Sequence, residues 1–185
     1  MKVLRRTQFG NPILRSKARL LSSKEILSAE TKELIVNMRF TLENKKYGVG
    51  LAAPQVGVSA SISVIAIKPT PTRPELKPLN MTIINPSIVK TYGSLKPMWE
   101  GCISGTELYG KAMRYDKIRL HWFDEDARQH EEDFESILAQ VLQHETDHLN
   151  GILFVDRVKD TKSYITFSEY KKLRKREAKQ KVLKN

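Results

Sequence analysis

The apolar positions of the chain alternate between helical and strand-like spacing, and the first helical stretch lies near the N-terminus. Ser22 and Glu25 there have the spacing of a capping box, in which each side chain bonds the other residue's backbone N–H. The apolar residues that follow lie on one helical face: Leu27, Leu34, Ile35, Met38 and Leu42. We therefore expect a helix that begins near Ser22 and ends near Asn44.

Strand-like segments occupy the middle of the chain. Residues 62–67 (ISVIAI) are rich in β-branched side chains and predict a strand. Shorter strand candidates are residues 81–84, 88–92 and 118–123. Residues 68–80 contain four prolines and predict a surface loop. Residues 9–15 (FGNPILR) predict a turn followed by a short extended or docking segment.

A second strong helical pattern begins at Phe134 or Ser136 and runs to about Asn150, where Gly151 should stop it. A third helix, highly charged and only weakly amphipathic, is expected from Asp160 onward. Because the strands are grouped between helices, the pattern predicts an α+β fold. In this fold, antiparallel or mixed β-sheets pack around the second helix, with further helices at the N- and C-terminal ends.

Length and charge divide the chain into two parts. With 185 residues the chain can form one domain with a substantial core, which we place in residues 1–160. Residues 161–185 are expected to form a basic helical extension, because residues 171–185 hold eight basic side chains and one acid out of a formal net charge of +11. The N-terminus has no apolar signal region, and no segment approaches membrane-spanning length. Cys102 is the single cysteine, so no internal disulfide can form, and we expect a cytoplasmic protein.

The sharpest chemical signal is the HETDH motif of the second helix. His144 and His148 are four residues apart, so both imidazoles lie on one helical face and can bind one metal ion. Glu145 lies one step around the helix, where it can take a proton from an attacking water without being a ligand. Two surface histidines on a solvated helix are the alternative, but the spacing favours a metal-dependent hydrolase. Upstream on the same face, Ile137 and Val141 suit an apolar substrate wall, although either residue alone could equally belong to the core.

A catalytic zinc-type site usually has three protein ligands, so a third one is required. A metzincin would carry its third histidine at position 154, where this chain has Phe154. Glu169 lies at a spacing that suits a thermolysin-like His2Glu site. Cys102, in the segment WEGCIS, is the other candidate, because as a thiolate it would complete a Cys/His2 set. Spacing alone leaves Glu169 and Cys102 both open.

A third segment, GVGLAAPQVG at residues 48–57, combines small residues with one amide side chain. Small residues permit close backbone approach, and the segment lacks the lysine and spacing of a phosphate-binding loop. It is either a tight loop that leads into a strand or part of a site. In a site, the Gln55 amide could donate a hydrogen bond to a substrate oxygen.

Taken together, GVGLAAPQ (48–55), EGCIS (100–104) and QHETDHLNG (143–151) closely resemble, in order and spacing, the three signature motifs of peptide deformylase. The FGNPILR segment also resembles the beginning of that family, and the resemblance covers about residues 5–157. It implies a metal-dependent hydrolase that removes the N-formyl group from formyl-methionyl nascent peptides. It also implies that the metal is Fe²⁺, with Zn²⁺ or Ni²⁺ as substitutes. The choice of Fe²⁺ comes from the resemblance, because the chemistry of the ligands does not distinguish these three ions.

Carried over motif by motif, the resemblance implies metal ligands Cys102, His144 and His148, and it makes Glu169 an ordinary helix residue. Glu145 would take a proton from the attacking water and return it to the departing amine. Gln55 and the backbone N–H of Ile103 would bind the formyl oxygen.

The substrate side of the site is also implied by this resemblance. Gly50 would lie close to the substrate, and Val49, Ile137 and Val141 would form a methionine-sized pocket. The chain departs from the family pattern at Gly105 and Thr106, where an apolar residue and proline are usual. It departs again at Tyr109, where a basic residue is common, although Arg114 is retained nearby. These departures bear on peptide preference more than on catalysis.

The basic segment 171–185 is either a solvated charged helix or a contact with ribosomal RNA near the exit of the nascent chain, as in some deformylases. The partners expected are therefore formyl-methionyl nascent peptides and the ribosome, with no membrane and no stable protein partner implied. Two rival functions remain at this point. One is a zinc endopeptidase that uses His144, His148 and Glu169, and the other is a weakly active ribosome- or RNA-binding relative.

Overall fold

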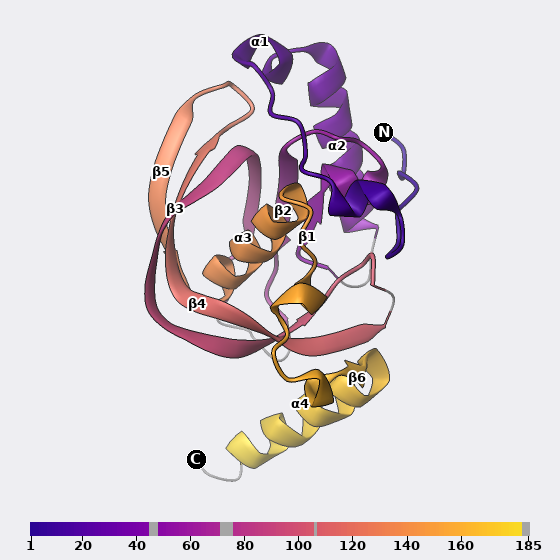
Figure 1. The fold of residues 1–185 in the computed structure, drawn as a ribbon, viewed down its shortest axis with the longest axis vertical. Helices are drawn as coiled ribbons and strands as arrows, with labels where there is room; N and C mark the ends of the chain where they lie inside the picture. Colours follow the sequence, from indigo (N-terminus) through magenta and orange to yellow (C-terminus); the bar gives the residue numbers. More distant parts are fainter. Residues whose placement is uncertain (45–47, 71–75, 106, 183–185) are drawn as a thin grey trace.

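A computed structural model describes residues 1–44, 48–70, 76–105 and 107–182 (Figure 1). The helices and strands follow one another as α1 (Ser23–Ile26), α2 (Ala29–Glu43), β1 (Gly50–Ala52), β2 (Ile62–Ile67), β3 (Leu79–Gly101), β4 (Leu108–Phe123), β5 (Gln129–Glu135), α3 (Ser136–Leu149), β6 (Ile165–Thr166) and α4 (Phe167–Val182). Single 3₁₀ turns lie at Pro12–Arg15, Ala53–Val56, Phe154–Arg157 and Thr161–Ser163.

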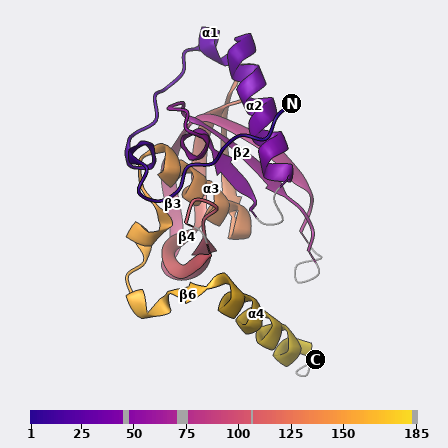
Figure 2. The same ribbon diagram turned by 90° about the vertical axis from the view of Figure 1, so that its right-hand side faces the viewer.

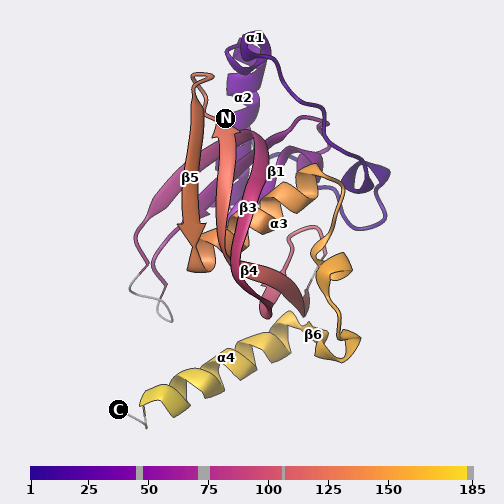
Figure 3. The ribbon, with the colours of Figure 1, turned by 60° about the vertical axis from the view of Figure 1, so that its left-hand side comes forward.

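The strands form one sheet in the order β1-β2-β3-β4-β5, and β6 also pairs with β4. Every strand pair in the described residues is antiparallel. The sheet curves around α3, which lies against its concave face (Figures 1 and 3). The predicted α+β fold with a central helix that carries the HETDH motif is therefore confirmed.

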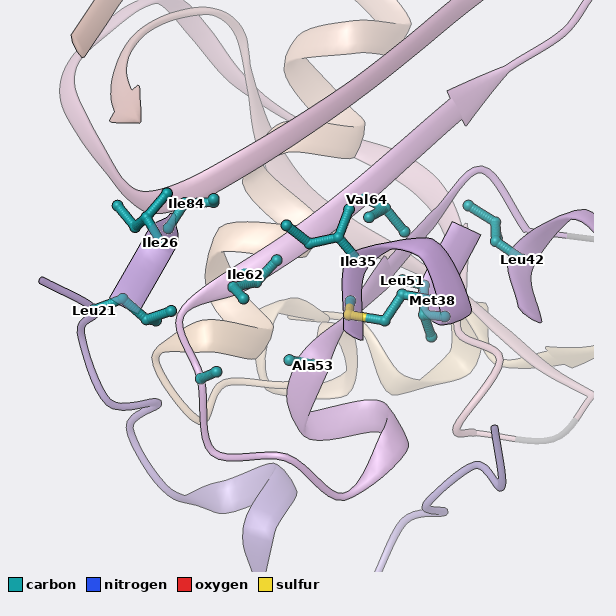
Figure 4. Packing of buried hydrophobic residues seen from close by; sticks show 11 residues of the cluster. Leu21, Ile26, Ile35, Met38, Leu42, Leu51, Ala53, Ile62, Val64 and Ile84 are labelled. Carbon is teal, nitrogen blue, oxygen red and sulfur yellow. The ribbon is translucent and has the colours of Figure 1, made fainter. Parts of the chain in front are cut away.

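The core is divided between the two faces of the sheet, because successive side chains of a strand point to opposite sides. On β2, Ile62 and Val64 pack with α1, α2 and β1, and this cluster is shown in Figure 4. Ile65 and Ile67 of the same strand join a second cluster with α3, β3 and β4. The helix that carries the histidines is thus held by its own apolar cluster, which includes Val141.

The first predicted helix is broken in two. The capping box is confirmed, since the Ser22 hydroxyl accepts from the Glu25 backbone N–H and the Glu25 carboxylate accepts from the Ser22 N–H. The helix that it starts ends at Ile26, and Leu27 is exposed rather than on the buried face. The cause is Ser28, whose hydroxyl accepts a hydrogen bond from the Thr31 N–H and so caps a new helix, α2.

The strand of residues 62–67 is confirmed, but the other strand predictions were too short. Residues 81–84 and 88–92 are parts of one strand, β3, and residues 118–123 are the end of the long β4. β-bulges between residues 84 and 95 interrupt the alternation of apolar side chains, although the main-chain pairing continues. β5, which is mostly polar, was not predicted, because its pairing with β4 is also made by the main chain. Residues 71–75 of the predicted loop lie outside the described residues, and β3 already begins at Leu79.

The second predicted helix is confirmed as α3, which begins at Ser136 and ends at Leu149. Gly151 follows with φ of +71°, a conformation that favours glycine after a helix. A Cβ atom at this position would lie 2.6 Å from the carbonyl oxygen of Arg15, so the N-terminal segment packs directly against the turn. Of the two predicted forms of this segment, extended or docking, the structure shows the docking one. Pro12–Arg15 form a 3₁₀ turn, capped by the Asn11 side chain.

The C-terminal helix begins later than predicted. Residues 161–163 form a 3₁₀ turn and residues 165–166 form β6, so that α4 starts at Phe167 rather than near Asp160. The pairing of β6 with Leu108 and Tyr109 of β4 holds this segment in extended conformation. α4 then runs across the end of the body and projects beyond it (Figure 2). Among the described residues, no helix is long and apolar enough to cross a membrane.

Candidate metal centre

Helix α3 and the turn after β3 bring together the three side chains that could hold a metal. His144 and His148 lie one turn apart on α3, with ring centroids 4.8 Å apart. The Cys102 Sγ lies 3.2 Å from Nε2 of His148. One ligand atom from each of the three residues falls within 4.8 Å of the others, and this is the one such group of His, Cys, Asp or Glu among the described residues.

The donor set fits a transition metal with one open position. Metal–sulfur and metal–nitrogen bonds of about 2.0–2.3 Å place neighbouring donor atoms roughly 3–4 Å apart. The 3.2 Å between the Cys102 Sγ and Nε2 of His148 lies in this range, and all three donor atoms lie within 4.8 Å of one another. Nδ1 of His144 bonds the Glu100 carboxylate at 2.9 Å, so Nε2 of this ring is the nitrogen left for a metal. The three residues can therefore hold a metal and leave one position for water or substrate.

The environment of Cys102 favours the thiolate that a metal requires. Burial raises the pKa of the Cys102 thiol, but attraction by His148 and hydrogen bonds with His144 and His148 outweigh it and hold the pKa well below its usual value. The pKa of His144 is lowered by burial and raised more strongly by its bonds with Cys102 and Glu100, so the net shift is well upward. A metal bound between them would take over the stabilisation of the thiolate.

A buried ion-pair network supports His144 from behind. The Glu100 carboxylate accepts two hydrogen bonds from Arg114, at 2.8 and 3.0 Å, besides its contact with His144. Arg114 also donates to Asp147 on α3 at 2.6 Å, and Asp147 accepts from Arg157. Burial raises the pKa of Glu100, but His144 and Arg114 together lower it to about 2. Glu100 therefore stays ionised and fixes the orientation of the His144 ring.

Glu145 lies beside the three donors and is almost completely buried, at 3% exposure. Burial raises the pKa of its carboxyl group, and the nearby imidazoles oppose this only in part. Its Oε2 has no hydrogen-bond partner within the described part of the chain. A buried carboxylate with a free oxygen and a raised pKa is suited to exchange a proton with a group in the pocket.

Gly50 leaves the space that the Glu145 carboxylate occupies. A Cβ atom on Gly50 would lie 2.2 Å from Oε1 of Glu145 and 2.8 Å from its Cγ. Both residues belong to regular elements, β1 and α3, so the backbone cannot easily yield. The absence of a side chain at position 50 is therefore required for the observed position of Glu145.

We expect Gly50→Ala to displace the Glu145 carboxylate and lower the turnover number by roughly 100-fold, the cost of about 1 Å of misplacement at a reacting group. The three atoms nearest to such a Cβ all belong to Glu145 and none to a proposed metal ligand, so metal content should stay at the wild-type level. Steady-state kinetics and metal analysis on the same sample check this. Wild-type turnover in a folded variant would show that the position of Glu145 is unimportant.

Gln55, on the 3₁₀ turn Ala53–Val56, and Ile103, next to Cys102, line the same pocket as the donors. Oε1 of Gln55 accepts from the backbone N–H of Ala52 at 2.8 Å, so the amide nitrogen is turned toward the site. This nitrogen lies 3.3 Å from the Cys102 Sγ and 3.2 Å from the Ser104 hydroxyl. Ile103 also lines the pocket, and its carbonyl oxygen accepts from Arg6.

The donors open into a pocket with a volume of about 220 Å³. The three apolar residues predicted to form a wall all line it: Val49, Ile137 and Val141. Val141 is buried at 5% exposure, whereas Val49 is 41% exposed at the mouth. One side of the pocket is aromatic, where Tyr109 stacks on Tyr170 with ring centroids 4.4 Å apart.

Two other residues considered from sequence lie outside the donor group. Glu169 is on α4, where its carboxylate pairs with Lys172 at 2.6 Å and its side chain is 57% exposed. It therefore cannot complete a site with the two histidines in this structure. Phe154 is buried, and its ring stacks near His144 at a centroid distance of 6.4 Å.

Of the residues at which the chain departs from the family pattern, Gly105 and Tyr109 lie in the described part of the chain. A Cβ atom on Gly105 would lie 2.8 Å from the Phe9 ring, so the N-terminal segment packs over this turn. Thr106 lies outside the described residues. Arg114 is not at the rim but buried in the ion-pair network. Tyr109 does lie at the rim, in contact with α4.

Glu100 and Tyr170 lie at the site but were given no role from the sequence. Glu100 orients His144, and Gln140 donates to the Trp99 carbonyl oxygen and to Glu100. Tyr170 lines the pocket from α4. Glu100 could have been found from sequence, because it is an acidic residue two positions before Cys102. Tyr170 is far from every motif, and it lines the pocket only because of how α4 packs.

The chain is similar to known proteins of one family. A family model described as polypeptide deformylase matches residues 3–164. A peptide deformylase from Leptospira biflexa is 40% identical over 168 residues, which cover 89% of this chain and 92% of that protein. One from Chlorobaculum parvum is 42% identical over 150 residues, which cover 81% of this chain and 76% of that protein.

Solved structures show the same fold. A class I type b peptide deformylase from Acinetobacter baumannii, with Met-Ala-Ser bound, superposes with a TM-score of 0.79 at 32% identity, covering 84% of this chain and 98% of that chain. A peptide deformylase from Synechococcus elongatus in complex with actinonin gives a TM-score of 0.76 at 36% identity, covering 86% and 81%.

Proposed function

The chain belongs to the polypeptide deformylase family of metal-dependent hydrolases, which remove the N-formyl group from nascent polypeptides, and from this premise we propose how its own residues perform the reaction. Cys102, His144 and His148 are the metal ligands. The observation that carries this assignment is the convergence of one sulfur and two imidazoles within 4.8 Å beside a buried carboxylate. When bound, the metal polarises the formyl group and lowers the pKa of the attacking water.

The metal that we propose is Fe²⁺, with Zn²⁺ and Ni²⁺ as substitutes. One thiolate and two imidazoles suit all three ions, so the choice of Fe²⁺ rests on resemblance to the family. A single cysteine that serves as a metal ligand also favours a reducing environment. The single cysteine, Cys102, therefore supports a cytoplasmic location.

Glu145 is the general base and then the general acid. It takes a proton from the water that attacks the formyl carbon and returns it to the amine nitrogen, while the C–N bond breaks and formate leaves. Its burial and raised pKa support both steps, since a carboxyl group that titrates nearer neutrality can give the proton back.

Gln55 and the backbone N–H of Ile103 bind the formyl oxygen as negative charge develops on it. The bond from Ala52 fixes the Gln55 amide with its nitrogen toward Cys102 and the pocket. To donate to the formyl oxygen, this nitrogen exchanges one of its contacts with Cys102 and Ser104. Gly50 leaves room for the Glu145 carboxylate, and its backbone lies close to the substrate in this proposal.

The first side chain of the substrate enters between Val49, Ile137 and Val141. These residues line the pocket next to the proposed ligands, and an unbranched methionine side chain suits such an apolar wall. Formyl-methionyl nascent peptides are therefore the substrate that we propose for this site.

The experiment that tests this function is hydrolysis of formyl-Met-Ala-Ser, with the products separated by mass spectrometry. We expect formate and intact Met-Ala-Ser. Cleavage at a peptide bond instead would indicate an endopeptidase, and binding without turnover would indicate a weakly active relative.

We also propose that the ribosome is a partner and that it contacts the basic helix α4. The family match ends at residue 164, which supports treating residues 161–185 as an extension to a catalytic domain of residues 1–160. On one face of α4, the exposed Lys172, Arg176 and Lys179 follow one another at helical spacing. Phosphate contacts by this outer face would weaken steeply with salt.

We expect the triple variant Lys172→Glu, Arg176→Glu and Lys179→Glu to abolish salt-sensitive binding to ribosomes. Losing about three phosphate contacts should lower the slope of log K against log salt by roughly 2–3. Sedimentation with ribosomes at several salt concentrations measures this slope. An unchanged slope would show that the outer face of α4 makes no contact with RNA.

A further inference from the structure

A second groove, with a volume of about 560 Å³, continues from the catalytic pocket. The two share five lining residues: Gly48, Val49, Tyr109, Ile137 and Tyr170. The groove lies between α4 on one side and the ends of α2 and β2 on the other. The catalytic pocket alone, at about 220 Å³, is smaller than the roughly 300–1,000 Å³ of usual ligand sites. A peptide whose first residue fills it must therefore continue elsewhere.

Aromatic contacts fix α4 as a wall of this groove. Tyr109 of β4 stacks on both Tyr170 and Phe167 of α4, with centroid distances of 4.4 and 5.4 Å. Trp99 of β3 lies 5.7 Å from Tyr170. Offset and tilted aromatic pairs of this kind are stabilising beyond their buried area. The junction between pocket and groove is therefore a built feature of the fold, to which the body and α4 both contribute.

The groove is apolar along its floor and positively charged along α4. Leu42, Ala66 and Ile67 are among the floor residues. Lys171, Arg174 and Lys175 line it from α4, and Lys68 lines it from the loop after β2. Glu43 is the one acidic residue in the lining of the groove, as far as the described residues define it.

The basic residues of α4 divide into two faces. Lys171, Arg174 and Lys175 have i, i+3, i+4 spacing and face the groove, whereas Lys172, Arg176 and Lys179 are not among its lining residues. Two of the groove-face cations have partners within α4: Arg174 pairs with Glu177 at 2.6 Å, and Lys171 lies over the Phe167 ring. The groove face still carries more positive than negative charge, and such a surface attracts acidic groups.

We propose that this groove binds the part of the nascent peptide that follows its first residues, and that the groove face of α4 selects acidic side chains there. The proposal rests on the deformylase function above, and it adds a preference for the sequence of the substrate. Its support is the continuity of the groove with the catalytic pocket and the charge of the α4 side chains.

The test compares two formyl peptides of equal length, formyl-Met-Ala-Ala-Glu-Glu and formyl-Met-Ala-Ala-Lys-Lys. At low salt we expect the kcat/KM of the acidic peptide to exceed that of the basic one by roughly 3- to 10-fold, as a few exposed ion pairs allow. At about 1 M salt, where the screening length is about 3 Å, the ratio should approach unity.

Two triple variants of α4 with equal charge change separate a local contact from a general field. In the groove-face variant, Lys171→Glu, Arg174→Glu and Lys175→Glu, we expect the preference to reverse. In the outer-face variant, Lys172→Glu, Arg176→Glu and Lys179→Glu, we expect it to persist. If α4 unfolds in the groove-face variant, as circular dichroism would show, the same three residues changed to Gln should abolish the preference without reversing it.

Binding of the deformylated peptides, Met-Ala-Ala-Glu-Glu and Met-Ala-Ala-Lys-Lys, measured by calorimetry, gives a readout that does not need turnover. If the protein binds the acidic peptide more tightly but releases no formate, the proposed function fails and the groove proposal stands. A wild-type ratio near unity in both measurements overturns the groove proposal. An equal shift in both triple variants also overturns it, as does a groove-face variant that loses only binding to ribosomal RNA.

Discussion

Cys102→Ala is expected to lose the metal and with it the hydrolysis of formyl peptides. Changing a residue that merely supports a ligand costs roughly 10- to 100-fold in metal affinity, so removing a ligand should cost more than about 100-fold. The two remaining imidazoles are too few for a catalytic site. Metal analysis after gel filtration should find the variant largely free of metal. Its turnover should fall by at least the factor by which its metal content falls.

The matched control is Glu169→Gln. Glu169 is the alternative third metal ligand that sequence spacing alone could not exclude. Because Glu169 is exposed and paired with Lys172, we expect wild-type metal content and turnover from this variant. The opposite pattern, with metal retained in Cys102→Ala and lost in Glu169→Gln, would replace the proposed site with a His2Glu site and contradict the account.

Glu145→Gln is expected to keep its metal and lose most of its activity. The amide has nearly the shape of the carboxyl group but cannot accept the proton of water, and general acid–base catalysis contributes roughly 100- to 10,000-fold. Turnover should fall by that factor, with metal content near the wild-type level. A variant that keeps full turnover would show that another group moves the proton.

The same variant should be at least as stable as the wild type. Burial raises the pKa of Glu145, which means that the folded state disfavours its carboxylate, and Oε2 has no partner among the described residues. Replacing the charge with an amide removes this penalty. A Tm equal to or above that of the wild type, together with lost activity, would identify Glu145 as a residue retained for catalysis at a cost in stability.

The HETDH helix could be predicted from sequence because one local pattern determines its spacing, its apolar face and its end at Gly151. The assignment of Cys102 could not be derived in this way. Cys102 follows the end of β3 and the histidines are on α3, so they meet only when the chain folds. Spacing along the chain therefore still allowed Glu169 as the third ligand. Resemblance to the family favoured Cys102, and the structure places its sulfur beside His148.

Other features could not be predicted from the sequence, mostly because they depend on contacts between residues far apart along the chain. The long β3–β4 hairpin was predicted only in part, since β-bulges disrupt the apolar alternation while main-chain pairing continues. The break between α1 and α2, by contrast, has a local cause, because Ser28 caps a new helix within an otherwise periodic stretch. Tyr170 lines the site because α4 folds back onto Tyr109, which no local pattern indicates.

The most direct test of the account is formate release from formyl-Met-Ala-Ser by protein purified anaerobically, measured before and after removal of the metal with a chelator. The account predicts stoichiometric release of formate and Met-Ala-Ser by the metal-loaded protein, loss of activity on chelation, and recovery when Fe²⁺ is added back. Formate release that survives complete removal of the metal, or its absence from the fully loaded protein, would contradict it.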